Sequence, residues 1–321
     1  MKNLSQIYSN LAIGLGGALL LSGCFAQDDF DLEADSNPPI VIQAVITDQA
    51  GPYYVQVSRA ISRTIFPADD NINITFSSIH DPVTNATVTL TDDQGNSDVL
   101  APYDQAFPIP NAQGDTLPFA AYGFYRTTTS LRGVPGSTYT LTVQHEGKTY
   151  EAKATMPQAP PAIRIDYDQL IYPLLSFSEP QGTDFYRFFY RRFSGNDLTT
   201  SRFFYNQVED NLWPLLYPKS QTYSDQFWGN EVENLDIYRV NFPQGTPQEE
   251  ICGVCPDNIQ IQMHTMTEEA YEFYNALNRQ IRTDGGTFNP EPATPPTNFS
   301  NGALGFFTVS TVRSIIAPIR Y

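Results

Sequence analysis

Cys252 and Cys255 form a C-x-x-C pair, a spacing that can support chemistry. Such a pair can hold a metal, act as a redox couple, or close a local disulfide. A metal would need two further ligands, and His264 is the only candidate nearby. A redox pair usually opens a helix, whereas Pro256 follows here in a β-rich context. Because the leader described below implies an oxidising compartment, we expect a disulfide that pins a loop; redox, metal and free-thiol roles are the alternatives.

His80, His145 and His264 are isolated in the sequence, without H-E-x-x-H or H-x-H spacing. We expect each to be a surface residue of a loop or strand rather than a ligand or base. Residues 92–96 (DDQGN) superficially echo a calcium loop, but the twelve-residue ligand pattern and closing Glu are missing, so a hairpin turn is expected. The chain has no G-x-S-x-G elbow or Gly-rich phosphate loop, and carboxylate pairs are uninformative among 35 acidic residues. The sequence therefore predicts no catalytic residue, metal or cofactor.

Aromatic residues are concentrated between positions 185 and 238. Packing in a core explains them most simply, because aromatic side chains bury a large apolar area. The alternative is a face that anchors a protein partner or stacks on a flat ligand. In residues 212–218 (LWPLLYP), prolines bracket an apolar run, which makes this the best candidate for an exposed patch. The candidate binding residues are Trp213, Tyr217, Phe227 and Trp228.

Residues 1–23 are typical of a secretory signal: Lys2 provides a basic start, and residues 11–21 form an apolar stretch too short to span a membrane. The sequence L-S-G-C ending at Cys24 resembles a bacterial lipobox. We expect the Cys24 thiol to receive a diacylglyceryl group, and the new amine to take an acyl chain such as palmitate, giving a stable membrane anchor. The alternative is an ordinary signal peptide with a chance cysteine.

The acidic segment behind Cys24 is expected to be a flexible tether over residues 24–37. Its run Q-D-D-F-D resembles the surface-export signal of Bacteroidetes lipoproteins, and the alternative is a simple solvated linker. The whole chain carries a net charge of −17, which argues against binding nucleic acid or anionic membranes through a basic surface. Solubility explains the acid most simply; recruitment of cations or a basic partner is the alternative.

From residue 38 onward the pattern is typical of β-structure. Residues 38–158 predict a sandwich of immunoglobulin or fibronectin type, with about seven short strands. The expected strands are 40–47, 53–58, 86–91, 122–131, 138–144 and 149–155.

Residues 159–321 predict a second β-rich domain with one amphipathic helix. The helix is expected over 268–282, with Thr267 as its N-cap. Residues 184–193 carry apolar side chains on both faces, so this strand should be covered on both sides. The other expected strands are 163–167, 201–208, 235–242, 258–266 and 303–316. The fold class predicted for the whole chain is mainly β.

Several blocks of the sequence resemble the lipoproteins grouped as domain of unknown function 4249. In the first half they are AVITDQAGPYYVQVSR, NATVTLTDDQGN and GVPGSTYTLTVQHEGKTYEAKATMPQAPP; near the end they are EAYEFYNAL, NFSN and LGFF. The resemblance spans most of residues 38–316 and brings no active-site residues with it. It implies an outer-membrane lipoprotein of Bacteroidetes, often encoded beside a TonB-dependent transporter.

The resemblance and the leader together lead us to expect a lipid-anchored protein of the outer membrane that faces the cell exterior. Its expected role is non-enzymatic: an accessory or binding subunit of a TonB-dependent transporter that helps to capture or gate substrate. Two alternatives stay open, a surface hydrolase with an unrecognised site and a structural or adhesive surface module. Converging carboxylates with shifted pKa values in a pocket would favour the hydrolase.

Overall fold

The computed structural model describes the chain in segments: residues 38–60, 81–107, 115–158, 162–167, 172–179, 182, 184–193, 210–216, 221–228, 230–237, 257–282 and 294–320. The leader, Cys24, the acidic tether, the pair Cys252 and Cys255, and the strand expected over 201–208 lie outside these ranges. Asn37–Tyr321 forms one compact unit. Mainly β-structure in several sheets is confirmed.

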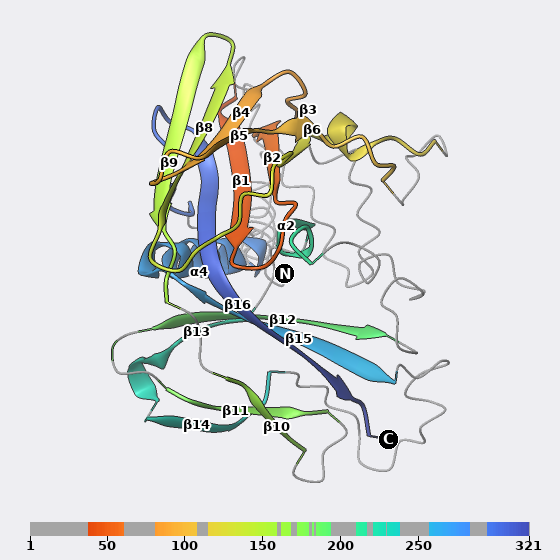
Figure 1. Ribbon diagram of the computed structural model, residues 1–321, viewed down its shortest axis with the longest axis vertical. Helices are drawn as coiled ribbons and strands as arrows, with labels where there is room; N and C mark the ends of the chain where they lie inside the picture. Colours follow the sequence, from red (N-terminus) through yellow and green to blue (C-terminus); the bar gives the residue numbers. More distant parts are fainter. Residues whose placement is uncertain are drawn as a thin grey trace, which may run out of the picture. The chain divides into compact units, whose positions relative to one another are not determined.

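The largest sheet joins the two halves of the chain. Its nine strands run in the order β13-β12-β15-β16-β1-β2-β7-β6, with β3 beside β2 (Figure 1). Their bounds are β1 Ile40–Thr47, β2 Tyr54–Arg59, β3 Asp81–Pro82, β6 Ala101–Pro102, β7 Phe124–Arg126, β12 Phe185–Phe193, β13 Gln221–Ser224, β15 Asn258–Met266 and β16 Leu304–Pro318.

The last strand, β16, pairs with both halves. Its first part lies parallel to β1, ending with Thr47 opposite Ser310, and its second part lies antiparallel to β15, beginning with Thr265 opposite Thr311. In Figure 1 it is the long blue strand that passes from β1 to β15. The C-terminal strand therefore completes a sheet begun at residue 40, while the expected domain boundary at residue 158 stays a prediction.

A four-stranded sheet covers one face of β1 and β2. It is ordered β5 (Ser97–Val99), β4 (Thr87–Asp92), β8 (Thr138–His145) and β9 (Lys148–Thr155). Alternate residues of facing strands fill the space between the sheets, and all are buried: Ile42, Ala44, Ile46, Val55, Val57, Val88, Leu90, Leu141 and Val143. The period of two along each strand is what places these side chains on one face.

The prediction of one strand over residues 122–131 is wrong in its extent. Within that range only β7 is a strand, and it follows the 3-10 turn η2 (Phe119–Tyr122). Gly123 ends that turn with φ 78°. A Cβ at this position would lie 2.1 Å from the carbonyl oxygen of Val57, so only glycine permits the close approach. Beyond β7, Thr128 and Thr129 leave the strand because their hydroxyl and backbone N–H groups donate hydrogen bonds to Asp98.

A three-stranded sheet covers the other end of the large sheet. It is ordered β10 (Arg164–Asp166), β11 (Leu174–Ser178) and β14 (Glu231–Leu235). Leu175, Phe177 and Val232 pack against one face of β12 and β15, at Tyr186, Phe188, Ile261 and Met263. Phe189 and Phe193 are buried on the opposite face of β12, which confirms that this strand is covered on both sides. Where a strand was expected over 235–242, β14 ends at Leu235, and residues 238–242 lie outside the described ranges.

The predicted helix is confirmed as α4, Glu268–Arg282. The Thr267 Oγ1 accepts a hydrogen bond of 3.3 Å from the backbone N–H of Ala270, as an N-cap does. Ala270, Phe273 and Tyr274 are its buried face, packed against Phe306 of β16. A second short helix, α2, covers Trp213–Leu216. None of the helices in the described segments combines the length and apolar character needed to cross a bilayer.

Candidate functional site

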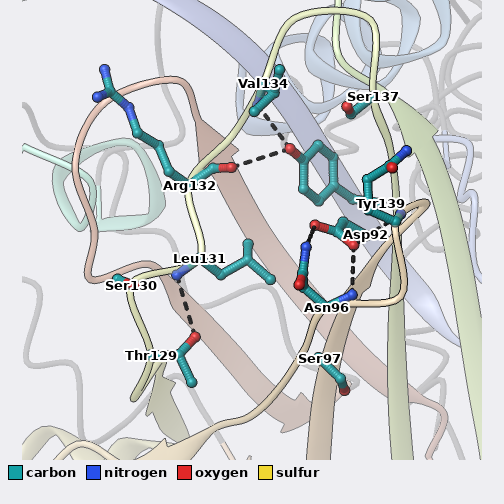
Figure 2. Close-up of a pocket in the computed structure, with 11 residues that line it drawn as sticks. Asp92, Asn96, Ser97, Thr129, Ser130, Leu131, Arg132, Val134, Ser137 and Tyr139 are labelled. Carbon is teal, nitrogen blue, oxygen red and sulfur yellow. Dashed lines mark hydrogen bonds between the residues drawn. The ribbon is translucent and has the colours of Figure 1, made fainter.

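An open cavity of about 740 Å³ lies between the β4–β5 hairpin and the loop that precedes β8. Its volume is in the range of small-molecule sites, roughly 300–1,000 Å³. Figure 2 shows the hairpin on one side and the loop on the other, with Tyr139 of β8 between them. Nine of the eleven residues in the lining have a polar or charged side chain: Asp92, Gln94, Asn96, Ser97, Thr129, Ser130, Leu131, Arg132, Val134, Ser137 and Tyr139.

Asp92 shapes the hairpin wall of the cavity. Its Oδ1 accepts hydrogen bonds from the backbone N–H groups of Gln94 (3.0 Å) and Asn96 (2.8 Å), and its Oδ2 accepts one from the Asn96 side-chain amide (2.7 Å). Gly95 completes the turn with φ 86°. The hairpin predicted over residues 92–96 is confirmed, and its side-chain bonds fix the position of Asn96 at the cavity.

Tyr139 holds the loop wall. Its ring is buried, and its hydroxyl accepts a hydrogen bond from the Val134 N–H (2.7 Å) and donates one to the Arg132 carbonyl (3.2 Å), as Figure 2 shows. Val134 projects its own side chain outward and is 53% exposed. One buried hydroxyl thus sets the path of the loop and presents an apolar side chain at the cavity.

Asp98 anchors the start of the same loop. It is 1% exposed, and its carboxylate accepts four hydrogen bonds of 2.7–2.9 Å from the N–H and hydroxyl groups of Thr128 and Thr129. Burial alone would raise the pKa of Asp98, but the hydrogen bonds from Thr129 and Thr128 outweigh it and leave the pKa below its usual value. A buried, ionised carboxylate therefore ties β5 to the loop.

Gly133 brings the loop against the end of β1. Its N–H donates a hydrogen bond of 3.1 Å to the Tyr53 hydroxyl, which itself lies within hydrogen-bond distance of the Thr47 and Gln49 carbonyls. A Cβ at position 133 would lie 2.2 Å from the Thr47 carbonyl oxygen and 2.4 Å from the Met156 methyl. Burial raises the pKa of Tyr53 to about 12, so its hydroxyl stays protonated.

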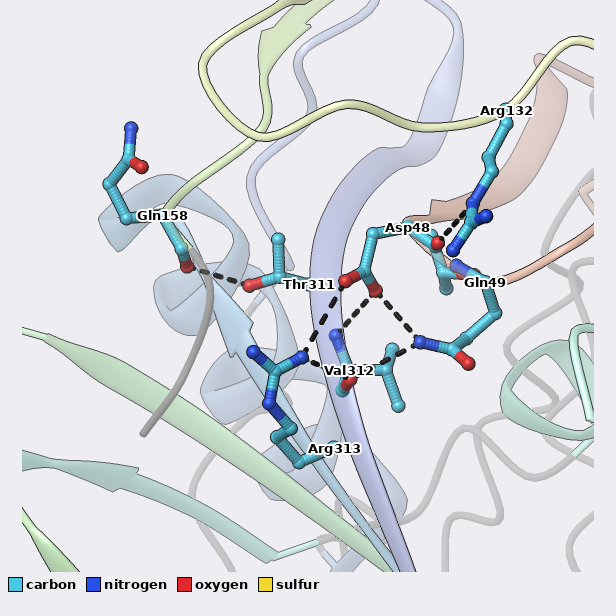
Figure 3. A network of polar contacts seen from close by, with 8 residues as sticks. Asp48, Gln49, Arg132, Gln158, Thr311, Val312 and Arg313 are labelled. Carbon is cyan, nitrogen blue, oxygen red and sulfur yellow. Dashed lines mark hydrogen bonds and ion pairs between the residues drawn. The ribbon is translucent and has the colours of Figure 1, made fainter. Parts of the chain in front are cut away.

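Asp48 connects this loop to the point where β16 changes partners. Its carbonyl accepts a hydrogen bond from Arg132 Nε (2.7 Å), and its Oδ1 accepts one from the backbone N–H of Val312 (2.8 Å). Figure 3 shows Arg313 and Gln49 closing the network around the same carboxylate. The cavity loop is thereby linked to both the N-terminal and the C-terminal strands of the large sheet.

The ionisable groups of the cavity suit binding better than proton transfer. The pKa of Asp92 is lowered, because hydrogen bonds from Asn96, Gln94 and Gly95 outweigh the opposing effect of burial. Burial raises the pKa of Tyr139, against the hydrogen bond from Val134. At neutral pH the first is a carboxylate and the second a neutral phenol, whereas a general acid or base works best with a pKa near the working pH.

The sequence-predicted binding residues lie elsewhere. Trp228 is half-buried and packs its ring on Tyr186 and against Phe177, with centroids 5.8 and 5.9 Å away. Tyr217 and the side chains of Trp213 and Phe227 fall outside the description. The prediction of an exposed patch over 212–218 is wrong at two positions. Leu212 and Leu215 are only 1% and 6% exposed, and both belong to a core cluster. Trp228 does not line the cavity.

The prediction of surface histidines is wrong for two of the three, which are buried; His80 lies outside the described residues. His145 is 8% exposed and His264 is 4% exposed. The His264 Nδ1 lies 3.0 Å from the Ser310 hydroxyl, and its Nε2 lies 3.3 Å from Oε1 of Gln262. Since Oε1 can only accept, Nε2 carries the proton. Burial and the nearby charge of Arg187 lower the pKa of His264 to about 3, so it is a neutral core residue.

Sequence reasoning missed the cavity because it treated residues 122–131 as a strand. The turn signal at Gly133–Gly136 was visible, but the burial of Asp98 beneath it was not, since an Asp beside a hairpin is usually exposed. A second cavity, between Pro214 and Leu215 of α2 and Phe273 of α4, has a volume of only about 10 Å³, too small for a ligand.

Comparison with known proteins gives one family. The family model described as Domain of unknown function (DUF4249) matches residues 27–316. Neither the curated proteins nor the solved structures contain a match. The matched range includes every residue that lines the 740 Å³ cavity and every strand from β1 to β15. The chain belongs to the DUF4249 family.

Proposed function

We propose that this protein is a lipid-anchored binding subunit on the outer membrane that assists a TonB-dependent transporter by contact rather than by catalysis. The observation that carries the proposal is the open cavity between the β4–β5 hairpin and the loop of residues 129–137. Its walls are held in place before any ligand arrives, by the hydrogen bonds of Asp92, Asp98 and Tyr139. A preformed site loses less conformational freedom on binding, which favours affinity.

The lining fits recognition of a polar partner. Hydroxyl and amide groups from Asn96, Ser97 and Thr129 surround one exposed apolar side chain, Val134. This mixture, an apolar contact within a polar rim, is what protein interfaces and ligand sites use for orientation. A segment of a partner protein or a substrate on its way to the transporter would meet these groups first.

The membrane setting of the proposal comes from the sequence. Acylation of Cys24 would anchor the chain, and residues 24–37 would be long enough to hold the folded unit away from the lipid. We also propose that the four-stranded sheet and the part of the large sheet within residues 38–158 form an immunoglobulin- or fibronectin-like sandwich, supported by the common core between β1, β2, β4 and β8. Cys252 and Cys255 are proposed to form a disulfide, because an exported chain is exposed to oxidation.

The hydrolase alternative would need converging carboxylates with raised pKa values in a cavity. Three carboxylates do converge, at Glu179, Asp184 and Asp225, but they line neither of the two cavities described above. The only carboxylate in the lining of the larger cavity is Asp92, whose pKa is lowered. Binding is therefore the function that the cavity supports best.

The test is recovery of the transporter with the protein from mildly solubilised outer membranes. We expect Val134→Glu to lower the recovered transporter at least several-fold, because it puts a charge in place of the exposed apolar side chain of the lining. Val99→Glu is the matched control, since Val99 is 60% exposed and lies on β5 outside the cavity lining. Repeated recovery of the protein alone, or equal recovery with both variants, would contradict the proposal.

The anchor has a separate test. Cys24→Ala should move the protein out of the membrane fraction, because no acyl chain could then be attached at that position. A Cys24→Ala protein that still fractionates with membranes and resists washing would refute the anchor. This result does not depend on the identity of the partner.

A further inference from the structure

Three carboxylates from separate segments converge where β11 ends and β12 begins. Glu179 directly follows β11, Asp184 directly precedes β12, and Asp225 opens the 3-10 turn η5 (Asp225–Phe227) after β13. One oxygen from each lies within 4.8 Å of the others. The pairing of β12 with β13 sets this geometry, and the Asp225 N–H donates a hydrogen bond of 3.2 Å to the Asp184 carbonyl.

The cluster contains buried oxygens without partners. Asp225 is 6% exposed, and its Oδ1 is buried with no hydrogen-bond donor among the residues that the structure describes. The Oε2 of Glu179 is buried in the same way, while its Oε1 accepts a hydrogen bond of 2.7 Å from the Tyr186 hydroxyl. Orphaned buried acceptors are rare in folded proteins and costly. A cation or a hydrogen-bond donor at these two oxygens would therefore stabilise the fold.

The described side chains around the cluster do not supply that partner. Among the residues that the structure describes, no Lys or Arg forms an ion pair with any of the three carboxylates. Burial, together with the charges of Asp225 and Asp184, raises the pKa of Glu179 to about 6 against the hydrogen bond from Tyr186. Burial and the charge of Asp225 also raise the pKa of Asp184. Three carboxylates whose oxygens lie within 4.8 Å of one another repel when charged, and a bound cation would relieve that repulsion.

We propose that Glu179, Asp184 and Asp225 bind a calcium ion. The donors are all carboxylate oxygens, which hard cations prefer, and calcium–oxygen distances of about 2.3–2.6 Å put opposite ligands roughly 5 Å apart. Oxygens within 4.8 Å of one another can therefore share one calcium shell. Magnesium gives up its waters reluctantly and is usually held by one or two carboxylates with waters or phosphates, so three converging carboxylates suit it less well. The site is separate from the 740 Å³ cavity, and its test does not require the transporter.

The first experiment is thermal unfolding of the purified full chain after treatment with EDTA, with and without 2 mM added CaCl₂. For a dissociation constant near 10⁻⁴ M, typical of extracellular calcium modules, this concentration multiplies the folded-to-unfolded ratio about 20-fold. We expect a rise of several degrees in the midpoint. No rise with calcium would overturn the proposal, and an equal rise with MgCl₂ would overturn the choice of metal.

Asp225→Asn separates a metal site from a purely structural acid cluster. Without calcium, this variant should melt at or above the temperature of the metal-free wild type, because it removes repulsion and a buried charge. It should nevertheless lose the response to calcium. Glu233→Gln, which removes an exposed carboxylate from β14, is the control and should keep the full response. An unchanged calcium response in Asp225→Asn would overturn the proposal; Glu179→Gln serves as a second variant if Asp225→Asn does not fold.

Terbium luminescence gives a readout independent of stability. Tb³⁺ takes oxygen ligands as calcium does, and light absorbed by a nearby aromatic ring excites it. Trp228 is suitably placed, because its backbone N–H donates a hydrogen bond of 2.6 Å to the Asp225 carbonyl and its ring stacks on Tyr186. We expect emission on excitation of tryptophan, displaced by added calcium and lost in Asp225→Asn. Emission of equal strength in the variant would contradict the assignment.

Discussion

Gly133→Ala is the sharpest perturbation of the loop that forms the cavity. The added methyl would lie 2.2 Å from the Thr47 carbonyl oxygen, 2.4 Å from the Met156 methyl and 2.7 Å from the Thr47 carbonyl carbon. The methionine end can move, but the backbone of β1 is fixed by pairing with β2 and β16. The loop itself must therefore shift outward.

The cost follows from two contributions. Overpacking a well-packed site costs about 1–3 kcal/mol, and losing the hydrogen bond from Gly133 to the Tyr53 hydroxyl costs about 0.5–1.5 kcal/mol. We expect a total of about 1.5–4.5 kcal/mol, which corresponds to a fall of roughly 2–8 °C in the melting temperature for a chain of this size.

The assay is thermal unfolding of purified wild type and variant, followed by circular dichroism. Gly51→Ala is the matched control: it adds the same methyl near the same loop, but its nearest neighbours are 3.7 Å away, at ordinary van der Waals contact. We expect the control to stay within about 0.5 kcal/mol of wild type. A Gly133→Ala protein as stable as the control would refute the close approach of the loop to β1.

Two pH experiments test buried ionisable groups. The folded-state pKa of Asp98 is below its unfolded value of about 3.9, so its contribution is present above that pH and lost as pH falls through the folded pKa. Asp98→Asn should therefore be about 1–3 kcal/mol less stable than wild type at pH 7, and the difference should be smaller at pH 3. Urea unfolding at the two pH values measures both differences, and differences of equal size at pH 7 and pH 3 would contradict this. The pKa of His264, about 3, is below its unfolded value of about 6.5. The unfolded state then binds more protons between these values, and stability rises with pH across that window by up to about 1.4 kcal/mol per unit. His264→Gln should flatten this rise, and an unchanged slope would count against a neutral buried His264.

Local patterns in the sequence predict the elements whose residues follow one period. The alternation in residues 138–144 and the helical spacing in 268–282 appear as β8 and α4, and Thr267 caps the helix as expected. In each case the side chains that fill the core are decided by the element's own geometry, with a period of two for strands and 3.6 for the helix.

Features that depend on distant pairing could not be predicted in this way. The change of partner along β16 depends on where β1 ends, and no local pattern marks Ser310 and Thr311 as the crossing point. Thr128 and Thr129 are β-branched and predict a strand, yet the buried Asp98 from another strand draws them into a loop. The carboxylate cluster likewise joins positions 179, 184 and 225, which only the sheet pairing brings together.

Site-specific photo-crosslinking tests the central claim most directly. A photoreactive amino acid in place of Val134 would project from the cavity, and one in place of Val99 would project from β5 outside it, since both side chains are more than half exposed. After irradiation of intact cells, the binding account predicts a crosslinked product from position 134 that contains a TonB-dependent transporter, with little or none from position 99. A product of equal yield from both positions, or none from position 134, would contradict the claim that this cavity works by contact with a partner.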